Sequence, residues 1–187
     1  MFKKSLLLSS FIITFALSLN AATISKDECA KKGDNFIFAG NECVEYKKFK
    51  GEVEDSLNII VHGTWKDGTD TLARYAPFAE DISMRTDITT IAVALPGYSK
   101  SSTNNFTSLS HEGVENLAAK KEYVEFLGEL VKALKKKYEA SKITYIGHSA
   151  GCMMGATLTG LKPALIDNLV CAGGVYDIKK EKPQLKE

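Results

Sequence analysis

Residues 23–187 are predicted to form one α/β domain, with a mainly parallel sheet and helices on both of its faces. The segments 57–61, 88–95 and 143–146 are short apolar runs rich in β-branched residues, as in strands that are buried on both faces. Segments with apolar residues at helical spacing separate these runs. Strands that alternate with helices are typical of βαβ units in a right-handed wound sheet.

The other elements follow from local patterns. Segments 36–39 and 43–49 are predicted to form a hairpin around Gly40-Asn41. Residues 69–83 have helical spacing, with Pro77 predicting a kink or an early break. Residues 96–111 are rich in serine and asparagine and are expected to form a loop. The remaining expected elements are an amphipathic helix over 115–138, a helix over 152–161, a strand over 169–172 and a solvated lysine-rich end over 179–187.

Residues 1–22 have the pattern of a secretory signal peptide. Lys3 and Lys4 precede an apolar run over 6–19, and the small residues Ala21 and Ala22 follow it. The alternative is an uncleaved anchor helix, but the run is short for a bilayer span. We therefore expect a periplasmic or secreted protein with no membrane partner after cleavage. About 165 residues then remain, enough for one domain with a core.

The charge and the cysteine content of the sequence indicate which partners, disulfides and cofactors to expect. Lys and Arg number 24 against 23 for Asp and Glu, so nothing indicates a nucleic-acid partner. An oxidising compartment permits disulfides among the four cysteines. Proximity favours Cys29 with Cys43, whereas Cys152 and Cys171 either face one another near the top of the sheet or remain free thiols. No cysteine or histidine spacing indicates a metal, and no cofactor is expected.

The segment Gly147-His148-Ser149-Ala150-Gly151 has the pattern G-x-S-x-G, directly after a predicted strand and directly before a predicted helix. This placement is that of a nucleophile elbow, a strained turn that holds a serine Oγ clear of the sheet. Such a turn tolerates only small neighbours, which Gly147 and Gly151 supply. The helix N-terminus also places partial positive charge near a developing anion.

A second segment agrees with this prediction. The strand 57–61 runs directly into His62-Gly63-Thr64-Trp65. Acyl transfer places negative charge on a carbonyl oxygen, and preorganised N–H groups must meet that charge. The expected donors are Ala150, which follows Ser149, and either Thr64 or its neighbour in the loop after His62 and Gly63.

Together with Pro96-Gly97-Tyr98 after the next strand, these motifs resemble the α/β-hydrolase superfamily in order and spacing. The resemblance covers most of 43–177. It implies a serine hydrolase of esterase type that acts on small-molecule esters or related acyl bonds, with Ser149 as nucleophile. It also implies that His62 organises the oxyanion loop and that His148 is a packing or pocket residue. Trp65 and Tyr98 are either acyl-pocket or packing residues.

The sequence departs from the family in its later part. The family order is serine, acid, histidine, whereas none of the three histidines follows Ser149. The resemblance implies that the last two strands and the base are missing. Asp177 is a candidate acid or a loop cap, and His111 is a candidate base or a helix-start residue. Two functions therefore remain open: an active hydrolase, or a non-catalytic scaffold whose open sheet edge a protein partner covers.

Overall fold

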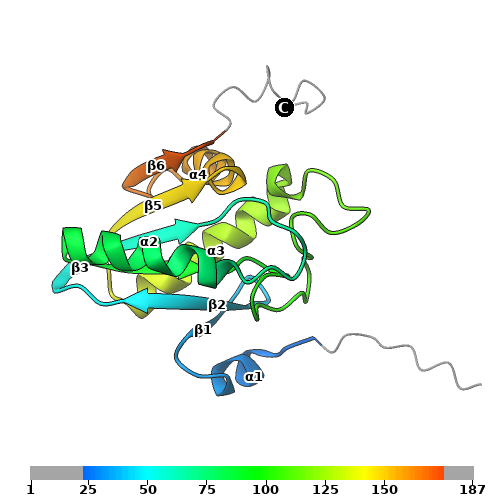
Figure 1. The fold of residues 1–187 in the computed structure, drawn as a ribbon, viewed down its shortest axis with the longest axis horizontal. Coiled ribbons are helices and arrows are strands. Elements are labelled where there is room, and N and C mark those ends of the chain that lie inside the picture. Colours follow the sequence, from blue (N-terminus) through cyan, green and yellow to red (C-terminus); the bar gives the residue numbers. More distant parts are fainter. Residues whose placement is uncertain (1–22, 175–187) are drawn as a thin grey trace, which may run out of the picture.

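The centre of the structure is one six-stranded sheet in the order β1-β2-β4-β3-β5-β6. A computed structural model describes residues 23–174 of the chain (Figure 1). The strands are β1 (Phe36–Ala39), β2 (Glu42–Phe49), β3 (Val53–Val61), β4 (Ile88–Val93), β5 (Lys142–His148) and β6 (Asn168–Ala172). All of the strands predicted from the sequence are present, and the predicted α/β class is confirmed.

The four strands that follow the hairpin run in parallel. β3 lies between β4 and β5 and is parallel to both, and β6 is parallel to β5. The antiparallel pairs are β1 with β2 and β2 with β4. The carboxyl ends of β3 and β5 therefore meet at one edge of the sheet, which is where active sites collect in open α/β sheets.

The helices lie on both faces of the sheet, as predicted. They are α1 (Lys26–Lys31), α2 (Thr71–Thr86), α3 (Lys121–Lys137) and α4 (Ala150–Leu161), with a 3₁₀ turn η1 (Leu117–Ala119). α2 lies in front of the sheet in Figure 1, and α3 and α4 lie behind it. The alternation along β5 matches this arrangement, since Tyr145 faces α4 while Ile146 and His148 face α2.

Two predictions about the helices were wrong. Of the kink or early break predicted at Pro77, the early break is wrong, because α2 continues to Thr86. Pro77 and Ala73 are both on the exposed side of α2, where water can replace the hydrogen bond that the proline removes. The helix expected over 115–138 begins only at Lys121, because Asn116 is left-handed at φ 52° and Lys120 is extended.

A buried carboxylate organises the long loop after β4. Glu42 is fully buried at the start of β2. Its two oxygens accept hydrogen bonds from the backbone N–H groups of Asn104, Asn105 and Phe106 and from the hydroxyl of Ser102. Hydrogen bonds to a charged acceptor are the strong ones, so Glu42 fixes the loop against the sheet.

Both cysteine pairs form disulfides. Cys29–Cys43 ties α1 to β2, as the proximity in sequence indicated, and Cys152–Cys171 ties α4 to β6. The predicted signal peptide, Asp177 and the lysine-rich end lie outside the described residues. Within 23–174, every helix is too short or too polar to cross a bilayer.

Candidate active site

Ser149 occupies a sharp turn between β5 and α4. Its backbone has φ 52° and ψ −119°, a conformation that a residue with a side chain rarely adopts. Its N–H donates to the carbonyl of Ala172 at 3.0 Å, and its carbonyl accepts from the N–H of Cys152 at 3.0 Å. A strained residue persists only where its surroundings fix it. Here β6 and the first turn of α4 hold its two backbone groups.

Three glycines allow the turn to pack against its neighbours. A Cβ at Gly147 would lie 2.5 Å from the N atom of Cys152, and one at Gly151 would lie 2.3 Å from the O atom of Val61. A Cβ at Gly63 would lie 2.6 Å from the Cβ of Ser149 and 3.2 Å from its Oγ. The loop after β3 is therefore in direct contact with the Ser149 side chain.

Both ring nitrogens of His62 form hydrogen bonds with the backbone. Its Nε2 accepts from the N–H of Leu95 at 3.0 Å, so Nδ1 carries the proton and donates to the Gly63 carbonyl at 2.7 Å. The ring is buried, and burial lowers the pKa of His62 to about 4. A ring with no free nitrogen cannot take a proton from Ser149, so the role that this geometry supports is orientation of the loop at Gly63.

His148 faces the opposite side of the sheet from α4. Its Nδ1 is 2.7 Å from the hydroxyl of Tyr75 in α2, and the same hydroxyl accepts from Trp65 Nε1 at 3.2 Å. Arg74 stacks on the Trp65 ring, with its guanidinium carbon 4.4 Å from the ring centroid. These contacts connect the segment before Ser149 to the loop after Gly63 by way of α2.

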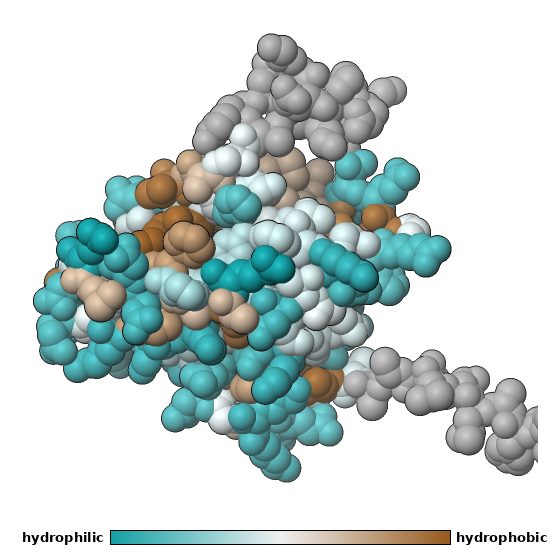
Figure 2. Space-filling view, viewed as in Figure 1, coloured by the Kyte–Doolittle hydropathy of each residue, from teal (hydrophilic) through white to brown (hydrophobic). Residues whose placement is uncertain are grey.

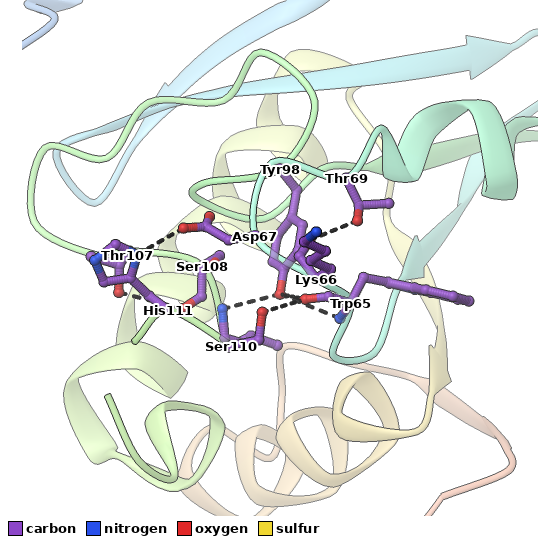
Figure 3. A network of polar contacts seen from close by, with 10 residues as sticks. Trp65, Lys66, Asp67, Thr69, Tyr98, Thr107, Ser108, Ser110 and His111 are labelled. Atoms are coloured by element: carbon purple, nitrogen blue, oxygen red, sulfur yellow. Dashed lines mark hydrogen bonds and ion pairs between the residues drawn. The ribbon is translucent and has the colours of Figure 1, made fainter. Parts of the chain in front are cut away.

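His111 lies on the long loop, above the carboxyl ends of the strands. Its Nδ1 is 2.7 Å from Asp67 Oδ2, and both side chains are about half exposed. The hydrogen bond from His111 lowers the pKa of Asp67. Figure 3 shows His111 pointing toward Asp67 within a network that joins the two loops. Within residues 23–174, no hydrogen bond joins His111 to Ser149, so the structure does not bring these two predicted residues into contact.

Tyr98 is at the centre of the same network (Figure 3). It is fully buried, and its hydroxyl donates to the carbonyl of Trp65 at 2.8 Å and accepts from the N–H of Leu109 at 3.1 Å. Tyr98 is thus the packing residue of the two alternatives. It joins the loop after β3 to the loop after β4.

A cavity of about 580 Å³ lies between α2 and the strands β5 and β6. Its lining is mostly apolar and includes Trp65, Phe78, Ile146 and Ala172, with Arg74 beside Trp65. Figure 2 shows apolar side chains gathered beside α2 over this part of the sheet. Phe78 and Val170 are among the large apolar residues left exposed. On β6, both Val170 and Ala172 are exposed among the described residues.

In the part of the chain that the structure describes, no group of three or more His, Cys, Asp or Glu side chains is placed to hold a metal ion. Sequence reasoning missed the pairs Asp67–His111 and Tyr75–His148. Their partners are 44 and 73 residues apart in the chain, and no motif spans either separation.

The parallel sheet, the strand–serine–helix turn and the glycine loop beside it define an α/β-hydrolase. The family model described as the alpha/beta hydrolase fold matches residues 59–186, and the chain belongs to this family. None of the curated proteins compared with the chain is significantly similar to it in sequence.

Solved structures share the fold at low sequence identity. A predicted CIB-like hydrolase from Thermoplasma acidophilum has a TM-score of 0.57 at 17% identity, over 83% of this chain and 68% of that one. A carboxylesterase from the thaumarchaeon Nitrososphaera gargenis has a TM-score of 0.55 at 14% identity, over 80% of this chain and 50% of that one. A bacterial membrane phospholipase A has a TM-score of 0.55 at 17% identity, over 76% of this chain and 40% of that one. The chain thus spans half or less of the last two proteins.

The packing of the turn predicts that alanine substitutions at two glycines of α4 change the stability in opposite directions. We expect Gly151→Ala to lower the free energy of unfolding by about 3 kcal/mol, because the new methyl would overlap the Val61 carbonyl. Gly160→Ala is the control, since a Cβ there meets nothing within 4 Å. It should stabilise the protein by about 0.5–1 kcal/mol. Urea denaturation measures both, and equal effects would contradict the packing.

The burial of His62 predicts a pH dependence of stability. The unfolded chain binds the proton near pH 6.5 and the folded chain only near pH 4, so the unfolded state holds more protons between these values. The stabilisation is therefore complete above pH 6.5 and is lost as the pH falls to about 4, by about 3 kcal/mol. In His62→Asn, which keeps a donor for Gly63, urea denaturation should show a flatter profile across this range. If stability depended on pH equally in His62→Asn and the parent protein, the assignment of this pH dependence to His62 would be contradicted.

Proposed function

We propose that this protein is a secreted serine hydrolase of esterase type that works through an acyl-enzyme at Ser149. The observation that carries the proposal is the backbone of Ser149, which is held at φ 52° and ψ −119° at the start of α4. Family membership supports a hydrolase. The two disulfides support an oxidising compartment, as a signal peptide over residues 1–22 would provide.

The proposed chemistry begins with attack of Ser149 Oγ on the carbonyl carbon of an ester. The oxyanion that forms is met by the N–H of Ala150, which belongs to the first turn of α4 and so has no partner within the helix. Thr64 supplies the second N–H, because the adjacent Gly63 is in contact with Ser149. The alcohol leaves, and water then hydrolyses the acyl-enzyme.

Among the histidines of residues 23–174, the contacts favour His111 as the base. His62 has no free ring nitrogen, and the Nδ1 of His148 is bonded to Tyr75 on the α2 side of the sheet. Asp67 at Nδ1 of His111 would fix the tautomer that leaves Nε2 as acceptor, and would stabilise the imidazolium once the proton is taken. We propose His111 as the base, with Asp67 as the residue that orients it. Asp177 remains a proposed alternative acid.

The substrate proposed is a small molecule with an apolar acyl group. The cavity beside α2 supports an apolar acyl group, because its lining is largely apolar. The lining includes Trp65 and also His148, which directly precedes Ser149. No cofactor enters the proposed reaction.

A second candidate function is binding without catalysis. The face of β6 that carries Val170, which is 48% exposed, and the apolar cavity next to it favour a protein partner that covers this edge. The two candidates differ in whether Ser149 is activated.

A fluorophosphonate tests this difference. Intact-mass spectrometry of the folded protein should show a single adduct, which Ser149→Ala abolishes. The control Ser141→Ala changes a serine just before β5 that bonds only the Asp55 carbonyl, and it should keep the adduct. A folded protein that forms no adduct would contradict the hydrolase and leave the binding function.

The same reagent tests His111. His111→Ala should slow adduct formation about 100-fold, since loss of a general base typically costs at least this much. Glu112→Gln, at the exposed neighbour, should leave the rate within twofold. An unchanged rate in His111→Ala would refute the base while leaving Ser149 as nucleophile.

A further inference from the structure

The disulfide Cys152–Cys171 joins the two segments that hold Ser149. Cys152 is in the first turn of α4, three residues after Ser149, and its N–H donates to the Ser149 carbonyl. Cys171 is in β6 and directly precedes Ala172, whose carbonyl accepts the N–H of Ser149. The carbonyl of Ser149 is therefore hydrogen-bonded to Cys152, one end of the disulfide. The N–H of Ser149 is hydrogen-bonded to Ala172, the neighbour of Cys171 at the other end.

Among the described residues, β6 has β5 as its one neighbouring strand. It pairs with β5 alone, through Gly147 opposite Cys171 and His148 opposite Ala172. The side chains of Val170 and Ala172, on one face of β6, are exposed. Local opening of β6 at this end would remove the acceptor of the Ser149 N–H.

The packing around the disulfide also indicates that it supports the turn at Ser149. The Cα atoms of Cys152 and Cys171 are 5.0 Å apart, and Cys152 is 2% exposed. A Cβ at Gly174 would lie 2.4 Å from the Sγ of Cys152 and 3.9 Å from the O atom of Ser149. The chain that leaves β6 thus passes directly over the sulfur and the turn.

We propose that Cys152 and Cys171 are positioning residues for the nucleophile, and that their disulfide keeps Ser149 in its reactive backbone conformation. This inference rests on the proposed function. The second disulfide, Cys29–Cys43, is a natural control, because it ties α1 to β2 near the opposite edge of the sheet.

The test compares Cys152→Ala/Cys171→Ala with Cys29→Ala/Cys43→Ala at a temperature at which circular dichroism shows both to be folded. Fluorophosphonate inactivation is separated into the affinity for the reagent and the first-order labelling rate of Ser149. The labelling rate should fall at least tenfold in the first variant and stay within twofold in the second, with the affinity unchanged in both. Equal rates in the two variants would overturn the proposal.

Hydrogen exchange of the backbone amides, followed by NMR, supplies a readout that does not need catalysis. The Ser149 amide should exchange at least tenfold faster without Cys152–Cys171 and at an unchanged rate without Cys29–Cys43. Unaltered exchange would overturn the positioning role. Absence of labelling in the parent protein would instead overturn the proposed function, and the exchange data would still decide the positioning role.

A variant that does not fold also gives an answer. If Cys152→Ala/Cys171→Ala and the larger-volume Cys152→Ala/Cys171→Val both fail to fold, the bridge supports the whole domain rather than the turn. That result would overturn the proposal as well.

Discussion

The site depends on the close approach of the α4 start to the end of β3. Gly151 packs on the Val61 carbonyl, and Gly63 packs on the Ser149 side chain, at separations that no larger residue allows. This contact brings the loop after β3 and the turn after β5 to the same point. The strain at Ser149 is maintained because β6, α4 and the glycine loop all fix the same residue.

The supports of this contact come from distant parts of the chain. His62 uses both ring nitrogens to hold the loop at Gly63 against the end of β4. Tyr98 then joins that loop to the one after β4, and the buried carboxylate of Glu42 fixes the latter against β2. The side chains of His62, Tyr98 and Glu42 are thus bonded inside the protein, while the outer loops carry the exposed pair Asp67–His111. An interior scaffold of this kind with functional loops at the strand ends is usual for open α/β sheets.

Much of this arrangement could be predicted from the sequence. The parallel strands were predictable because strands buried on both faces are almost continuously apolar, and the elbow because Gly147, Ser149 and Gly151 fall at a strand-to-helix junction. The break before α3 was not predictable, because Leu117 and Ala118 are buried whether the segment is helical or 3₁₀. The contacts of His111, Tyr75 and Glu42 depend on how loops fold back in three dimensions, and single-sequence patterns carry no such information. Cys152–Cys171 was left open because only the pairing of β6 with β5 brings the two cysteines together.

The central claim is that the turn at Ser149 presents an activated hydroxyl beside two backbone N–H donors that bind the oxyanion of the substrate. A crystal structure of the protein after fluorophosphonate treatment tests it most directly. The account predicts phosphorus bonded to Ser149 Oγ, with a phosphoryl oxygen roughly 2.7–3.1 Å from the N atoms of Ala150 and Thr64. An unmodified Ser149 in the treated protein, or a phosphoryl oxygen directed away from both donors, would contradict it.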